Sequence, residues 1–229
     1  MSDTDGHAGG RAAVPAGSAG AVLLVVALLL CSLPTGVAAE TTTAADLLRA
    51  LTVAGERGDA TYDRAKFRHW VDANGDGCDT RQEVLIEESR KAVAYGVDCT
   101  VTSGRWYSYY DGVAWTNPSD VDIDHVVALK EAWVSGARRW GEGRRQRFAN
   151  DTRFAGSLVA VTDNVNSSKG DRDPAEWLPD RARCRYAIQW ARVKYRWRLT
   201  IDRAERAALS DILRGGCGAR QVRLPPRVS

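Results

Sequence analysis

The chain of 229 residues is poor in several residue types on which common enzyme sites depend. It has three histidines, at positions 7, 69 and 125, so a metal centre built from several histidines, such as a three-histidine zinc site, is excluded. Its five cysteines include no Cys-x-x-Cys pair, which argues against a zinc ribbon. With 44% hydrophobic and 27% charged residues, the composition is that of a globular protein and not of a disordered or fibrous one.

The longest apolar run is too short for a comfortable membrane span. It covers residues 21–33, thirteen residues against the about 20 that a spanning helix needs. The run follows Arg11 and precedes the small residues 37–39 (VAA), a pattern typical of signal-peptide cleavage. We therefore predict a signal peptide over residues 1–39, cleaved after Ala39, and a secreted mature chain without stable membrane association. The alternative is an uncleaved segment that anchors the N-terminus in the membrane.

Export changes the meaning of the cysteines, because disulfides form in oxidising compartments. Once Cys31 leaves with the signal peptide, four cysteines remain, an even number that allows three connectivities. We expect the pairing of neighbours along the chain, Cys78–Cys99 and Cys184–Cys217. Each bridge would close a loop and stabilise the fold by roughly 3 kcal/mol or more in the chain-entropy model.

Charge is distributed unevenly along the mature chain. Residues 40–137 hold 10 Lys and Arg against 17 Asp and Glu, whereas residues 138–229 hold 21 against 10. An acidic half beside a basic half suits a metal site next to a surface that binds a polyanion. Arginine-rich amphipathic helices that simply keep their outer faces hydrated are the other interpretation.

The length suits one domain of about 150 residues with additions. We expect a short N-terminal segment over residues 40–60 and a single domain over residues 61–229. Hydrophobic spacing predicts helices over residues 83–95, 129–134, 181–198 and 203–213, and strands over residues 99–102, 121–127 and 157–162. Asp202 and Glu205 form a capping-box pattern at the start of the last helix.

The residues that carry chemistry concentrate in two segments, VDIDHVV (121–127) and LVAVTDNVNSSKGD (158–171). In the first, Asp124 stands directly before His125 at the end of a predicted strand, so an oxygen ligand and an imidazole occupy adjacent positions. Imidazole is the side chain whose ordinary pKa suits a general base near neutral pH. The second segment is a short strand that runs into a polar turn. Its Asn and Asp oxygens suit Mg²⁺, which takes few protein ligands and keeps several waters.

Together these segments resemble the HNH (ββα-metal) nuclease superfamily, and more particularly secreted actinobacterial HNH proteins related to the GmrSD C-terminal domain. The resemblance covers most of residues 62–217. It is carried by DANGDGCDTRQEVL (72–85), DIDHVVALKEAW (122–133), FAND (148–151), LVAVTDNVNSSKGDRDPAEWLP (158–179) and CRYAIQWARVKYRW (184–197). It implies an α+β fold in which a ββα-metal (HNH) core is embedded in a mostly helical single domain with two disulfides.

The resemblance also implies roles for single residues. Asp124 and Asn166 match the metal ligands, and His125 matches the general base that activates water. Lys169 matches a catalytic lysine that, with the arginines of residues 138–153, would neutralise flanking phosphates. The name HNH stands for a histidine, an asparagine and a second histidine along the chain. This chain lacks the second histidine, because no histidine follows His125. The candidates for a third metal ligand are Asn164, Asp171 and water.

The implied activity is metal-dependent hydrolysis of phosphodiester bonds in DNA, and in RNA as an alternative substrate. One Mg²⁺ or Mn²⁺ ion would serve as cofactor and the product would carry a 5′-phosphate. Because phosphate contacts hold little sequence information, we expect cleavage to be largely independent of sequence. Nothing in the sequence indicates an oligomer, so a monomer is expected.

Residues 72–83 match the calcium-loop pattern D-x-[DN]-x-[DN]-G-x₅-E. The residues that would bind a structural Ca²⁺ are Asp72, Asn74, Asp76 and Glu83. The other interpretation is a turn that caps a helix beginning near Thr80. If this loop were the functional part and residues 124–169 a degenerate scaffold, the protein would be a non-catalytic extracellular calcium-binding module.

Several neighbouring residues have ordinary structural interpretations. His69, beside Trp70 and without an adjacent acidic residue, is best explained by packing. The eight tryptophans are expected mostly in the core, although one could stack on a base. For Asp120 and Asp122, which alternate with Asp124 on the predicted strand, support of the metal site and plain solvent exposure both remain open.

Overall fold

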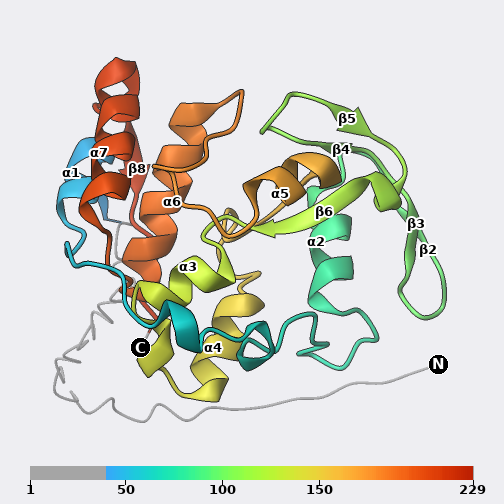
Figure 1. Ribbon diagram of the computed structural model, residues 1–229. Coiled ribbons are helices and arrows are strands. Elements are labelled where there is room, and N and C mark those ends of the chain that lie inside the picture. The colour runs from blue at the N-terminus through green and yellow to red at the C-terminus, as the bar shows by residue number, and fades with distance from the viewer. Residues whose placement is uncertain (1–39, 229) are drawn as a thin grey trace, which may run out of the picture. The chain divides into compact units, whose positions relative to one another are not determined.

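The computed structural model describes residues 40–228, so the predicted signal peptide lies outside the described residues. The described part combines helices and short strands (Figure 1). Its α-helices are α1 (Ala44–Arg49), α2 (Thr80–Glu88), α3 (Leu129–Val134), α4 (Glu142–Ala149), α5 (Asp163–Lys169), α6 (Arg183–Trp197) and α7 (Arg203–Ile212). Its strands are β1 (Thr41–Thr43), β2 (Ala94–Tyr95), β3 (Val101–Ser103), β4 (Trp106–Tyr107), β5 (Ala114–Trp115), β6 (Val121–His125), β7 (Leu158–Thr162) and β8 (Gln221–Arg223).

The strands pair two by two and antiparallel: β1 with β8, β2 with β3, β4 with β5, and β6 with β7. Short 3₁₀ turns lie between the other elements, namely η1 (Asp59–Thr61), η2 (Arg64–Lys66), η3 (Pro118–Asp120) and η4 (Ala137–Arg139). A π-helical segment, η5 (Leu213–Cys217), follows α7. Within residues 40–228, no helix is long and apolar enough to cross a bilayer.

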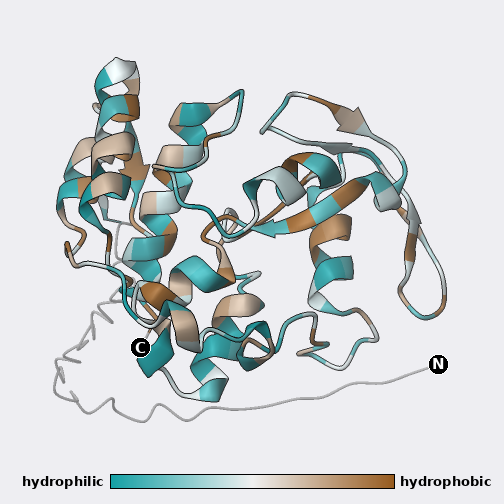
Figure 2. Ribbon diagram, in the orientation of Figure 1, coloured by the Kyte–Doolittle hydropathy of each residue, from teal (hydrophilic) through white to brown (hydrophobic). Residues whose placement is uncertain are grey.

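The β6–β7 pair positions the residues that the sequence singles out. Along β6, hydrophobic and acidic residues alternate, as the colours of Figure 2 show. Because successive side chains of a strand point to opposite faces, Val121 and Ile123 enter a small core with α2, while Asp122 and Asp124 face the other way. Helix α5 follows β7 directly and packs on β6 on the face of the two aspartates. The strand pair is therefore covered by α2 on one face and α5 on the other.

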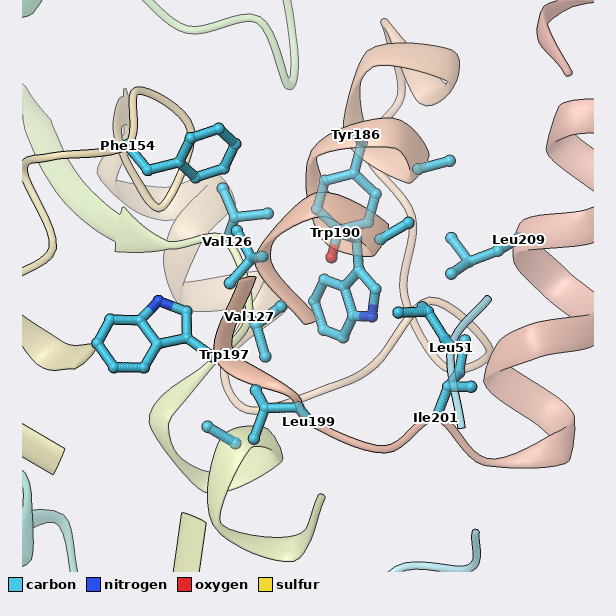
Figure 3. Packing of buried hydrophobic residues seen from close by; sticks show 14 of the residues in the cluster. Leu51, Val126, Val127, Phe154, Tyr186, Trp190, Trp197, Leu199, Ile201 and Leu209 are labelled. Atoms are coloured by element: carbon cyan, nitrogen blue, oxygen red, sulfur yellow. The ribbon is translucent and has the colours of Figure 1, made fainter. Parts of the chain in front are cut away.

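A second, larger core lies around α6. It buries Tyr186, Trp190 and Trp197 of that helix together with Val126 and Val127 (Figure 3). These valines follow His125 directly, so the chain is anchored in packed hydrophobic side chains immediately after β6. Burying side chains of this size contributes about 1.5–3 kcal/mol each. The end of β6 is thus fixed by the small core before it, with α2, and by the larger core after it, around α6.

Residues 40–60, expected as a short segment ahead of the domain, are part of the domain itself. Strand β1 pairs with β8 near the C-terminus, with Thr42 opposite Val222. In α1, Leu47 and Leu48 are buried in the larger core. A segment that supplies core residues and a paired strand is not a linker.

The four described cysteines form the two expected disulfides. Cys78 pairs with Cys99 across a Cα–Cα distance of 5.1 Å, and Cys184 pairs with Cys217 across 6.1 Å. The second bridge joins the start of α6 to the segment after α7. The predicted pairing of the four cysteines is therefore confirmed.

Most predicted elements occur within a few residues of their expected bounds, and the capping box of Asp202 and Glu205 is confirmed. Two expectations were wrong. The helix expected over residues 83–95 begins at Thr80 and ends at Glu88, because residues 94–95 pair as a strand with β3. The polar turn expected after residue 162 is helix α5, which packs on the β6–β7 pair.

Candidate functional site

A pocket of about 210 Å³ opens between the end of β6 and α5. It brings together Asp124, His125 and Asn166, which stand up to 42 residues apart in the sequence. The remaining lining residues are Arg64, Ile123, Ala128, Leu129, Ser167, Gly170 and Asp171. The two segments that the sequence marks as carrying chemistry therefore meet in one place.

Asp124 is buried and held by two donors. The Tyr110 hydroxyl donates to its Oδ2 at 2.6 Å, and the Lys169 ammonium donates to its Oδ1 at 2.8 Å. Burial raises the pKa of Asp124 above its ordinary value, and the charge of Lys169 opposes that shift. Each carboxylate oxygen can accept more than one bond, so Asp124 keeps acceptor capacity toward the pocket.

Lys169 lies beneath the site and not at its surface. Its side chain is 0% exposed, and its ammonium also donates to the carbonyl oxygen of His125 at 3.0 Å. A buried ammonium requires such partners, because removing it from water without them costs several kcal/mol. The expectation that Lys169 neutralises flanking phosphates does not fit this burial. Lys169 instead joins Asp124 to the backbone at the end of β6.

The imidazole of His125 is oriented by a backbone carbonyl. Its Nε2 lies 2.8 Å from the carbonyl oxygen of Ala149, at the end of α4. A carbonyl only accepts hydrogen bonds, so Nε2 carries the proton and Nδ1 holds a lone pair when the ring is neutral. Burial lowers the pKa of His125 to about 3. At neutral pH the ring is therefore a neutral proton acceptor.

Two aromatic rings stack on this imidazole. The ring centroid of Trp70 is 5.6 Å away at an interplanar angle of 28°, and that of Phe148 is 6.5 Å away at 19°. Trp70 has a φ of 55°, which is unfavourable for a bulky residue and costs of order 1–3 kcal/mol. Its segment is tied to the end of α4 by Asn150, which accepts from Val71 N and donates to the Arg68 carbonyl. Residues 148–150 thus hold both the imidazole and the loop that carries Trp70.

Asn166 reaches the pocket from α5. Its amide nitrogen donates to Oδ2 of Asp122 at 3.0 Å. Because the nitrogen is used in this bond, the amide oxygen is the atom left to bind a ligand. Asp122 therefore supports Asn166. Asp120 lies at the other end of β6, in η3, where its carboxylate accepts from the Ser119 hydroxyl at 3.5 Å.

The donors in the pocket suit a divalent metal ion. Asp124 and Asn166 offer a carboxylate and an amide oxygen, the ligands that Mg²⁺ and Mn²⁺ prefer. Of the candidates for a third ligand, Asp171 lines the same pocket and Asn164 does not. Oxygen donors and a neutral imidazole in one pocket are groups that can support metal-assisted hydrolysis.

The part of the chain that holds Asp124, His125 and Asn166 matches a known family. Residues 79–212 match the family described as GmrSD restriction endonucleases, C-terminal domain, which is more than half of the chain. The chain belongs to this family. An uncharacterized secreted protein of Arthroderma benhamiae is 45% identical over 173 residues, which are 75% of this chain and 83% of that protein. No solved structure matches the chain.

The residues that match the family, 79–212, include Asp124, His125, Asn166 and Lys169, whereas Arg64 lies outside them.

Sequence reasoning missed the roles of several residues around the pocket. Tyr110 comes from an aromatic, turn-rich stretch in which no pattern marks one residue over another. The FAND segment (148–151) carries part of the family resemblance, but its residues give no sign that the Ala149 carbonyl meets His125.

Three of the arginines of residues 138–153 are used inside the fold. Arg138 donates to the carbonyls of Arg57 and Val134, and Arg144 donates to those of Trp197 and Val228. Arg145 is buried and donates to the Lys66 carbonyl at 3.1 Å. These three members of the 138–153 group hold loops and helix ends together, whereas Arg139, Arg147 and Arg153 of the same group are exposed.

The acidic loop at residues 72–83 gathers its side chains at the start of α2, outside the pocket. Asp72 accepts from the backbone nitrogens of Gly75 and Gly77, at 2.7 and 3.0 Å. The Asn74 amide donates to Asp76 at 2.9 Å and to Glu83 at 3.5 Å. Burial and the neighbouring carboxylates raise the pKa of Glu83. The expected capping is present as well, through the Asp79 carboxylate and the Gln82 nitrogen.

His69 does not line the pocket. Its Nδ1 contacts the Phe67 carbonyl at 2.9 Å, and its ring packs edge-on against Trp70. This placement agrees with the packing interpretation.

Proposed function

We propose that the protein is a secreted, metal-dependent endonuclease of the HNH type that hydrolyses phosphodiester bonds of DNA, with RNA as an alternative substrate. The observation that carries the proposal is the convergence of Asp124, His125 and Asn166 on one pocket, with the proton of His125 committed to the Ala149 carbonyl. Membership of a family of endonuclease domains supports the same reaction class.

The local topology supports the HNH assignment. Strands β6 and β7 pair antiparallel, and α5 follows β7 without a connecting loop. In this ββα order, Asp124 and His125 end the first strand and Asn166 lies on the helix. One divalent ion, Mg²⁺ or Mn²⁺, would be held by Asp124 and Asn166. When bound, it would supply positive charge to a phosphate oxygen and to the leaving 3′ oxygen.

The side chains of this protein would carry the remaining steps. Nδ1 of His125 accepts a proton from a water molecule as the water oxygen forms a bond to phosphorus. The bond between phosphorus and the 3′ oxygen breaks, and that oxygen takes a proton from solvent. The products are a 5′-phosphate and a 3′-hydroxyl. Lys169 and Tyr110 hold the Asp124 carboxylate in place throughout.

Secretion is part of the proposal. The name of the Arthroderma benhamiae relative states that it is a secreted protein, and two disulfides suit an oxidising compartment. A monomeric enzyme that recognises the phosphate backbone of the nucleic acid would bind less tightly as the salt concentration rises. It would also cleave with little regard to base sequence.

The test is degradation of plasmid, single-stranded DNA and RNA by residues 40–229, with Mg²⁺, Mn²⁺, Ca²⁺ or EDTA. We expect cleavage that requires Mg²⁺ or Mn²⁺ and that is lost in His125→Ala. His69→Ala is the matched control, because it removes the other histidine of the mature chain and should keep most of the activity. A folded wild-type protein that cleaves nothing with any of these ions would refute the nuclease proposal.

A second candidate role rests on the loop of residues 72–83, where four potential oxygen ligands are gathered at the start of α2. We propose a structural Ca²⁺ site formed by Asp72, Asn74, Asp76 and Glu83. Isothermal titration with Ca²⁺ should show binding that is lost in Asp72→Ala and retained in Asp124→Asn. If Ca²⁺ binds here while the protein lacks nuclease activity, the non-catalytic calcium-binding module is the better description.

A further inference from the structure

Negative charge builds up at the substrate phosphate in the proposed reaction, and Lys169 is not available to stabilise it. The phosphodiester carries one negative charge, and more charge develops on its oxygens as water attacks. The Lys169 ammonium is fully buried and used by Asp124 and the His125 carbonyl. Any side-chain charge that adds to that of the metal ion at the substrate phosphate must therefore come from another residue.

Arg64 is placed for this role. Among the described residues that line the pocket, it is the only lysine or arginine, and it shares that lining with Asp124, His125 and Asn166. Its side chain is exposed, and within residues 40–228 it forms no ion pair. The two acidic residues of the pocket, Asp124 and Asp171, leave its guanidinium without a salt-bridge partner.

The segment around Arg64 is firmly anchored, although the side chain itself is exposed. Asp63 caps the short η2 turn by accepting from Ala65 N at 2.9 Å. Phe67 is 0% exposed and packs edge-on against Trp133 and Phe148. A guanidinium that starts from a fixed backbone loses less entropy when it binds than one on a mobile loop.

We infer that Arg64 is a catalytic residue that binds the substrate phosphate, with its guanidinium contacting non-bridging oxygens at the scissile position. This inference rests on the proposed nuclease function. A planar guanidinium can donate two parallel hydrogen bonds to a phosphate, which an ammonium cannot do in the same geometry. It would add positive charge to that of the metal ion, while His125 acts on the water.

The experiment compares Arg64→Ala and Arg64→Lys with Arg68→Ala. Arg68 is an exposed arginine on the same segment that does not line the pocket, so it controls for a general loss of positive charge. We expect Arg64→Ala to lower kcat by about 100-fold or more and Arg64→Lys to recover only part of that loss, as for removal of a donor that acts in the transition state. Arg68→Ala should change kcat by less than about threefold. Millimolar guanidinium added to Arg64→Ala should restore part of its activity.

The failure of this inference can be told apart from failure of the proposed function. If wild type cleaves and His125→Ala does not, but Arg64→Ala keeps kcat within about threefold, then Arg64 is not the phosphate ligand and the nuclease proposal stands. If wild type cleaves nothing, the nuclease proposal falls, and binding of a fluorescein-labelled 12-mer in EDTA decides on Arg64. Weaker binding in Arg64→Ala but not in Arg68→Ala would still support a phosphate contact there, and equal binding would overturn it.

Discussion

Replacing Lys169 by methionine should destabilise the protein strongly, because it leaves the buried Asp124 carboxylate without its cation. Methionine has a similar length and no charge, so it fills the same space without restoring the ion pair. Removing one partner of a buried pair typically costs about 3–5 kcal/mol, whereas losing an exposed phosphate-binding lysine costs about 0.5 kcal/mol or less. For a domain of this size, that corresponds to a fall in Tm of roughly 6–20 °C.

The assay is urea unfolding at pH 7 in EDTA, followed by tryptophan fluorescence, for wild type, Lys169→Met, Asp124→Asn and the double variant. If the loss comes from an uncompensated charge, the double variant should be more stable than Lys169→Met alone, because the neutral amide of Asn can still accept from Tyr110. Lys130→Met is the matched control, since Lys130 forms an exposed ion pair with Asp59. A stability of Lys169→Met within about 1 kcal/mol of wild type would refute the account of Lys169 as a buried structural partner.

Three further predictions follow from other contacts. Trp70→Ala should lower kcat by about tenfold or more and leave KM nearly unchanged, because the indole ring orients His125 and does not bind substrate. Trp70→Phe, which keeps an aromatic ring, should keep most of the activity. Equal changes of kcat and KM in Trp70→Ala would contradict this role. Burial raises the pKa of the Glu88 carboxyl above its ordinary 4.5. The unfolding free energy of wild type relative to Glu88→Gln should therefore be highest below about pH 4.5 and should fall as the pH rises through the raised pKa. Urea unfolding of both proteins at pH 4 and pH 8 measures this, and a stability difference that does not change with pH would show that Glu88 is solvated. Replacing Cys184 and Cys217 by serine removes a bridge between residues 33 apart in the sequence, and it should lower the unfolding free energy by about 3.5–4 kcal/mol. A loss below about 1 kcal/mol would mean that packing alone holds α6 and α7 together.

The sequence by itself determined the parts of the protein that depend on local pattern. The alternation of VDIDHVV marks a strand with one apolar face, and the capping box at Asp202 marks the start of α7. The four cysteines of the mature chain indicated the two bridges, because neighbours along the chain are the easiest to join. The Asp-His pair at a strand end singled out Asp124 and His125, whereas Asn166 was indicated by the resemblance to HNH nucleases.

Only the tertiary structure decided what surrounds those residues, because their partners come from distant segments. The Ala149 carbonyl meets His125 from 24 residues away, and Tyr110 reaches Asp124 across 14. Whether a lysine is a surface phosphate ligand or a buried partner depends on packing, and Lys169 proved to be the second. The exposed cation of the pocket is Arg64, 60 residues before Asp124 in the sequence. Burial and long-range contact fix these roles, and neither leaves a local signal in the order of residues.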